Sequence, residues 1–175
     1  FPREVNLYEV GPRDGLQNEK EIIPINIKIN LINKLINCNF KEIEIGSFVS
    51  PKWVPQMADS EIIVDKINRT KLISLPVLTP NLRGLQKAIE KKVDTVCVFI
   101  TASESFSKKN TNCSVSDSVK RVEEVIREAK KNDIKVRGDR SCVLGCPYEG
   151  KVSHKKTADL ASFLIDQGCY QISLG

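Results

Sequence analysis

The sequence contains no apolar run that approaches the ~18 residues needed to cross a bilayer. Its first residues lack the long apolar core of a signal peptide. Glycine and proline are sparse, at 9 and 8 of 175 residues, while 41% of the residues are hydrophobic. These values exclude a collagenous, low-complexity or intrinsically disordered chain. We therefore expect a soluble globular protein with one core and no membrane partner.

Histidine occurs only once, at His154 near the start of a predicted helix, where we expect it on the surface. The six cysteines are irregularly spaced, and Cys142 and Cys146 are one residue too far apart for a C-x-x-C pair. This spacing disfavours both a zinc site and a disulfide framework. We expect reduced thiols and a reducing compartment, which is the cytoplasm of a bacterium or the mitochondrial matrix of a eukaryote.

A clustered basic stripe is also missing. The net charge of +5 comes from 27 basic and 22 acidic residues, and the lysines are scattered over predicted helix surfaces. A nucleic-acid-binding protein would gather such charge on one face, so we expect no nucleic-acid partner. An anionic small substrate is compatible with this charge.

Short β-rich runs alternate with amphipathic helical stretches along the chain. Apolar residues at 25, 29, 32 and 36 recur with the period of a one-sided helix, for example. Ser114 and Asp117 have the spacing of a helix-capping box. We expect strands within residues 5–10, 42–45, 72–78, 95–101, 134–143 and 170–174, and helices within residues 24–36, 59–67, 82–89, 115–129 and 156–167.

This alternation predicts an α/β fold with a parallel sheet, because each helix returns the chain to begin the next strand in the same direction. An open doubly wound sheet would carry a Gly-rich phosphate loop after the first strand, and residues 11–15 lack that spacing. We therefore expect a TIM (β/α)8 barrel. Such a barrel needs ~250 residues, so residues 1–175 predict a single incomplete domain of five strand-helix units and a sixth strand, with unpaired edges and an exposed apolar interior.

Arg13 and Asp14 follow the first predicted strand, at the barrel end where catalytic groups lie. Asp14 offers the hard oxygen that Mg²⁺ or Mn²⁺ prefers, and Arg13 could stabilise an oxygen that gains negative charge. A structural ion pair beside a turn glycine is the alternative.

Glu44 lies between isoleucines in the second predicted strand, where a carboxylate needs a partner. Arg13 with a metal could supply one, and so could a buried pair with Arg137 of the fifth strand. Glu9 on the first strand has the same choices, and we expect a structural pair between Glu9 and Arg137 inside the barrel.

Four segments carry a specific resemblance to the 3-hydroxy-3-methylglutaryl-CoA lyase family. They are residues 9–19 (EVGPRDGLQNE), 47–57 (SFVSPKWVPQM), 108–114 (KKNTNCS) and 141–150 (SCVLGCPYEG). The resemblance continues along essentially the whole chain, in order. It implies a metal-dependent barrel enzyme that cleaves 3-hydroxy-3-methylglutaryl-CoA to acetyl-CoA and acetoacetate, in leucine breakdown and ketone-body formation.

The resemblance also implies roles for individual residues. Asp14 matches the family's metal-binding aspartate, Arg13 its catalytic arginine and Glu44 the acidic residue that supports them, and these three form the expected catalytic set. Three further residues match positions near the substrate and also have a plain alternative as turn or loop hydrogen bonders: Gln17, Ser47 and Asn110. Arg13 is expected to contact the substrate as well. Ser114 is expected to cap a helix and Cys146 to serve the loop structure.

Two departures from the family pattern stand out. Asp139 and Arg140 occupy positions where the family usually carries Tyr-Val, which places charge near the substrate cavity. The family's His-x-His metal pair would follow beyond residue 175, so Asp14 is the one metal ligand expected here.

The resemblance implies an acyl-CoA substrate, a divalent metal (Mg²⁺ or Mn²⁺) and a homodimer for the full-length protein. Two other functions remain open. One is a different barrel metallo-lyase or Claisen-type synthase acting on a related acyl-CoA. The other is an inactive fragment that retains part of a CoA-binding surface.

Overall fold

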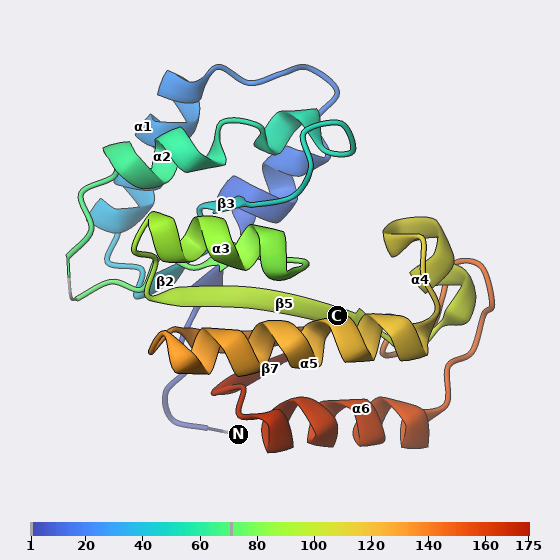
Figure 1. The fold of residues 1–175 in the computed structure, drawn as a ribbon. Coiled ribbons are helices and arrows are strands. Elements are labelled where there is room, and N and C mark those ends of the chain that lie inside the picture. Colours follow the sequence, from blue (N-terminus) through green and yellow to red (C-terminus); the bar gives the residue numbers. More distant parts are fainter. Residues whose placement is uncertain (1, 71) are drawn as a thin grey trace.

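A computed structural model describes residues 2–70 and 72–175 and shows alternating strands and helices (Figure 1). The strands are β1 Tyr8–Glu9, β2 Glu42–Ile43, β3 Gly46–Ser47, β4 Val77–Leu78, β5 Thr95–Thr101, β6 Lys135–Ser141 and β7 Gln171–Leu174. The α-helices are α1 Ile25–Asn37, α2 Ser60–Lys66, α3 Leu82–Glu90, α4 Glu104–Thr111, α5 Val115–Lys131 and α6 His154–Gln167. Two shorter turns are η1 Gly11–Gly15, a π-helix, and η2 Pro55–Met57, a 3-10 helix. Among the described residues, no helix combines the length and apolar character needed to cross a membrane.

The strands pair in parallel and in the order in which they occur along the chain. β1 pairs with β2, and the sheet then runs β3-β4-β5-β6-β7. The two sheets meet between β2 and β3, where the Glu44 amide donates to the Glu9 carbonyl at 2.8 Å and the Ile45 amide donates to the Pro76 carbonyl at 3.0 Å. The α/β parallel sheet predicted from the sequence is confirmed. Sequential order is typical of a (β/α) barrel, whereas a doubly wound sheet reverses its order at a switch point.

Several elements differ from the sequence-based expectation. The expected strand at 42–45 is β2 at Glu42–Ile43, and β3 at Gly46–Ser47 was not expected. The expected strands at 5–10 and 72–78 shorten to two residues each, at β1 and β4. Pro76 has no amide hydrogen to donate to the sheet, and Val5, Leu7 and Leu72 are all well exposed. α4 was not expected, because its polar sequence lacks helical apolar periodicity; it begins where Ser103 caps the amide of Phe106.

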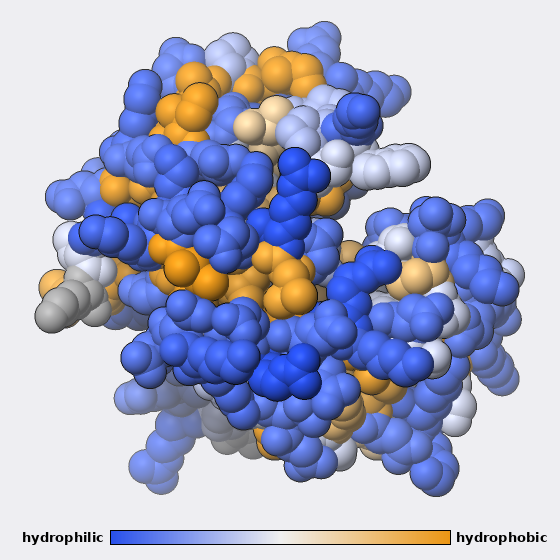
Figure 2. All heavy atoms as spheres, viewed as in Figure 1, coloured by the Kyte–Doolittle hydropathy of each residue, from blue (hydrophilic) through white to orange (hydrophobic). Residues whose placement is uncertain are grey.

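The apolar core lies between the sheet and its helices rather than inside the curve of the sheet. α5 packs on β5 and β6, and α6 on β7 (Figure 1). Ile43, Val96, Val98 and Val136 point into this layer and pack with helix residues such as Ile126. Hydrophilic residues cover most of the face seen in Figure 2, with apolar patches between them.

The opposite face of the sheet is polar, so the exposed apolar interior expected from the sequence is wrong. Alternation along each strand sends one set of side chains to the helices and the other set to this face. The polar set, identified by mutual contacts across strands, is Tyr8, Glu42, Glu44, Cys97, Arg137, Asp139 and Gln171.

Candidate active site

The turn η1 sets the positions of Arg13 and Asp14 directly after β1. The carbonyl of Val10 accepts hydrogen bonds from the amides of Arg13 at 3.0 Å and Asp14 at 2.7 Å. Buried Pro12 is the second residue of this turn and has no amide hydrogen to donate, which suits the first turn of a helix, where amides have no partner within the helix. The turn therefore holds both side chains at the carboxyl end of β1, which is the catalytic end of a parallel barrel.

Arg13 bridges two carboxylates. Its Nε donates to Glu44 Oε1 at 2.5 Å, and a terminal nitrogen donates to Asp14 Oδ1 at 2.7 Å. The Glu44 side chain is completely buried, whereas 53% of the Asp14 side chain is exposed. Burial opposes the charge on Arg13, but the carboxylates of Glu44, Asp14 and Asp139 together outweigh it and raise the pKa of the guanidinium above its ordinary value. The pair presents a fixed cation beside an accessible carboxylate.

The sequence left the partner of Glu44 open, and the structure assigns it to Arg13. The expected pair between Glu9 and Arg137 is wrong. Glu9 follows Tyr8 and so faces away from the polar side of the sheet, and its carboxylate accepts the Gly11 amide at 2.6 Å.

A network that sequence reasoning missed lies beneath Glu44. The Tyr8 hydroxyl lies 3.0 Å from Cys97 Sγ and donates to Glu44 Oε2 at 3.4 Å. Arg137 stacks over the Tyr8 ring, with its Cζ 3.7 Å from the ring centroid, and its terminal nitrogen donates to Asp139. Burial raises the pKa of both the Tyr8 hydroxyl and the Cys97 thiol, which therefore stay neutral. The period-two spacing of residues 137 and 139 was the available signal, since it places both on one face.

The surroundings of Asp139 in this network disfavour its ionised form. Burial, and then the charge of Glu44, raise its pKa to about 6, while Arg137 and Arg13 act in the opposite direction. Asp139 stands where the family usually carries Tyr, so this substitution places a second carboxylate close to Glu44 in a buried environment.

The remaining expected site residues are held less closely. Ser47 is buried at the end of β3, and its amide donates to the Ser60 hydroxyl at 3.0 Å. Gln17 is half-buried just after η1. Asn110 is exposed on α4. Within residues 2–70 and 72–175, neither the Gln17 nor the Asn110 side chain forms a hydrogen bond, and the structure brings only Arg13, Asp14 and Glu44 into direct contact.

A divalent cation fits Asp14 better than the network below it. Asp14 is accessible, and its Oδ2 forms no hydrogen bond within the described part of the chain. Ligand atoms of Glu44, Cys97 and Asp139 also lie within 4.8 Å of one another. Two guanidinium groups already pair with those carboxylates, and a neutral thiol is a poor ligand for Mg²⁺.

His154 is exposed at the start of α6, as expected.

Cys146 belongs to a tight turn after β6. Its amide and carbonyl exchange hydrogen bonds with Gly150 at 2.7 and 2.8 Å, and its Sγ lies 3.0 Å from the Ser103 hydroxyl. Ser114 caps α5 by accepting the Asp117 amide at 3.1 Å, which confirms Ser114 as the predicted helix cap.

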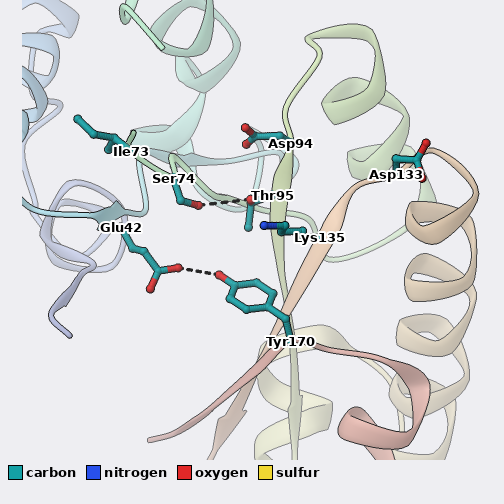
Figure 3. A pocket seen from close by; sticks show the side chains of 8 residues that line it. All are labelled: Glu42, Ile73, Ser74, Asp94, Thr95, Asp133, Lys135 and Tyr170. Atoms are coloured by element: carbon teal, nitrogen blue, oxygen red, sulfur yellow. Dashed lines mark hydrogen bonds between the residues drawn. The ribbon is translucent and has the colours of Figure 1, made fainter. Parts of the chain in front are cut away.

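A polar hollow of about 230 Å³ lies at the other end of the sheet (Figure 3). Tyr170 points its hydroxyl at Glu42 at 2.8 Å, and Ser74 donates to Thr95 beside them. These residues lie at the amino ends of the strands, away from Arg13 and Asp14, where barrels carry stability rather than catalysis.

The geometry can now be compared with known proteins. The HMGL-like family model matches residues 4–175. The bovine mitochondrial hydroxymethylglutaryl-CoA lyase is 50% identical over all 175 residues, which cover 54% of its length, so the chain spans about half the length of the curated relatives it matches. The solved hydroxymethylglutaryl-CoA lyase of Pseudomonas aeruginosa is 48% identical with a TM-score of 0.95, over 99% of this chain and 58% of that one. An HMG-CoA lyase of Acinetobacter baumannii, solved with coenzyme A and 3-methylmalate, is 34% identical with a TM-score of 0.92, over 97% of this chain and 55% of that one. With its parallel sheet and the Arg13-Asp14 turn at the carboxyl end of β1, the chain belongs to the HMGL-like family.

Proposed function

We propose that the protein containing this chain is a divalent-metal-dependent lyase that cleaves 3-hydroxy-3-methylglutaryl-CoA to acetyl-CoA and acetoacetate. The observation that carries the proposal is the Arg13 bridge between accessible Asp14 and buried Glu44, in a chain about half identical to lyases of that name. The coenzyme A in the Acinetobacter baumannii lyase supports an acyl-CoA substrate.

The proposed reaction breaks the carbon–carbon bond beside a tertiary hydroxyl. The hydroxyl proton passes to a base, and the hydroxyl carbon becomes the ketone of acetoacetate as the bond to C2 breaks. The bond electrons form an enolate whose negative charge lies on the thioester oxygen, and this enolate then takes up a proton at C2 to give acetyl-CoA. Mg²⁺ or Mn²⁺, when bound, would lower the pKa of the hydroxyl and orient the substrate. Asp14 supplies a hard, accessible oxygen that would hold this ion.

Arg13 is the cation suited to the enolate oxygen, because its remaining N–H groups are fixed in direction by the two carboxylates it already binds. Glu44 serves Arg13 rather than the substrate: it is completely buried and holds the guanidinium through Nε. Gln17, Ser47 and Asn110 are proposed as substrate contacts near the carboxyl ends of the strands, on the family resemblance.

Organisation and setting are part of the proposal. Residues 1–175 are proposed as one barrel-type domain, supported by the unbroken sequential order of the strands. All six cysteines are free, which supports a reducing compartment, and relatives carry both mitochondrial and cytoplasmic names. A homodimer of the full-length protein is proposed and can be checked by light scattering.

The test is an assay of the full-length protein with 3-hydroxy-3-methylglutaryl-CoA and Mg²⁺. We expect acetoacetate and acetyl-CoA in equal amounts. Failure to form acetoacetate, together with turnover of another acyl-CoA in a substrate panel, would assign the protein to a different metallo-lyase or a Claisen-type synthase.

A further inference from the structure

Asp139 lies at one end of a continuous series of contacts that reaches Glu44. We propose that Asp139 is a positioning residue for Glu44: it holds Arg137 over the ring of Tyr8, and Tyr8 in turn holds the second oxygen of Glu44. The inference rests on the proposed function only where it assigns a catalytic consequence to the orientation of Glu44.

Two side-chain partners fix the position of Arg137. Arg137 and Asp139 lie two residues apart on β6 and therefore share a face, and they form an ion pair there. Gln171 of β7 accepts the Arg137 Nε at 3.0 Å. These two bonds lie in the plane of the guanidinium and fix its orientation, and one of its broad faces covers the Tyr8 ring, with Cζ 3.7 Å from the ring centroid.

The contacts continue from Tyr8 to Glu44. With its ring covered by Arg137, Tyr8 directs its hydroxyl between Cys97 Sγ at 3.0 Å and Glu44 Oε2 at 3.4 Å. Arg13 holds the other oxygen, Oε1, at 2.5 Å. Both carboxylate oxygens of Glu44 therefore have a hydrogen-bond partner. Loss of the bond from Tyr8 would leave the Glu44 carboxylate free to rotate about its bond to Arg13.

Ionised Asp139 is electrostatically unfavourable in its surroundings. The charged and titratable groups that face Asp139 are Glu44, Arg137, Arg13, Asp14 and Cys97. Two carboxylates and a thiol within 4.8 Å of one another, in a buried setting, repel when both acids are ionised. Burial first, and then this repulsion from Glu44, raise the pKa of Asp139 to about 6. A residue that is unfavourable when ionised is not explained by stability, and sites under functional demand carry such groups.

The experiment compares Asp139→Asn with Asp133→Asn in the full-length protein. Asp133 precedes the same strand, is exposed, and lies at the opposite end from Glu44, so it controls for the chemical change alone. The readouts are the denaturation midpoint at pH 7 and the rate at which Cys97 reacts with a thiol-alkylating reagent, followed by mass spectrometry of its peptide. Neither readout requires catalytic activity.

We expect Asp139→Asn to leave the midpoint unchanged or raised, and to speed alkylation of Cys97 about 10-fold as Arg137 and Tyr8 loosen. Asp133→Asn should change neither. An unaltered Cys97 rate in folded Asp139→Asn would overturn the proposal, and so would a lowered midpoint without a change in that rate, because a structural ion pair behaves in that way.

Activity then tests the consequence for Glu44. Asp139→Asn and Tyr8→Phe should each lower kcat about 10-fold with little change in KM, and the double variant should be no worse than either single one, because both act on Glu44 through one path. Additive losses would overturn the proposal. If Asp139→Asn fails to fold, Asp139→Ala carries the same test; Tyr8→Phe tests the last contact alone, since it keeps the ring under Arg137 and removes only the hydroxyl. Should the wild type show no lyase activity, the proposed function fails while the Cys97 rates still decide the positioning.

Discussion

Arg13 and Glu44 form a 2.5 Å ion pair that joins the turn after β1 to the segment between β2 and β3. Glu44 is completely buried, so its charge depends on this partner. The same guanidinium also binds Asp14, which is accessible. One side chain thereby links the fixed interior of the sheet to the end where a substrate and a cation could meet.

Arg13→Lys tests the geometry of that link. Lysine keeps the positive charge but cannot hold two carboxylates in a planar fork while presenting further N–H groups. We expect kcat of the full-length protein to fall about 100-fold, the scale of losing a transition-state donor. Arg83→Lys on the exposed surface of α3 is the control and should retain full activity. Wild-type activity in Arg13→Lys would show that simple charge suffices.

Asp14→Asn tests the proposed cation site. The amide keeps the shape of the side chain but removes its negative charge, so affinity for Mn²⁺ in a calorimetric titration should fall together with activity. Stability should change by no more than about 0.5 kcal/mol, because the side chain is half exposed. Asp166→Asn on exposed α6 is the matched control. Unchanged Mn²⁺ binding would remove Asp14 from the site.

Asp139 should make stability depend on pH in a defined direction. Its pKa is about 6 in the folded chain against an ordinary 3.8, so between these values the folded state binds more protons than the unfolded state. The free energy of unfolding therefore falls as pH rises from about 4 to 6, by up to about 3 kcal/mol from this group. Chemical denaturation across that range should show the slope in the wild type and its loss in Asp139→Asn. An identical slope in both proteins would place the titration elsewhere.

Arg140→Val should stabilise the protein. Arg140 is 1% exposed, and none of its guanidinium nitrogens finds a hydrogen-bond partner within residues 2–70 and 72–175. Burial lowers its pKa, which shows that the surroundings disfavour the charge. Valine removes the unpaired cation and matches the family pattern at this position, so we expect a gain of about 2 kcal/mol in the free energy of unfolding. A loss of stability would mean that the guanidinium has a partner outside the described residues.

Local patterns along the chain were enough for much of the fold. The strand at 95–101 and the helix α5 follow from short-range periodicity, and the cap at Ser114 follows from a spacing of three residues. The Arg13-Asp14 turn could be placed at a strand end because strand alternation and turn residues are local properties. The start of the first strand was placed too early, because exposed Val5 and Leu7 are residue types typical of strands.

Local sequence patterns did not predict which side chains pair across the sheet. Arg13 rather than Arg137 became the partner of Glu44, and Glu9 turned away from both, because register and the facing of each strand decide which side chains meet. The contacts from Asp139 through Arg137 and Tyr8 to Glu44 join β6, β1 and the segment between β2 and β3, which are far apart in sequence. The alternation of residues assigns each side chain to a face, but only packing in three dimensions selects its neighbour, its burial and therefore its charge.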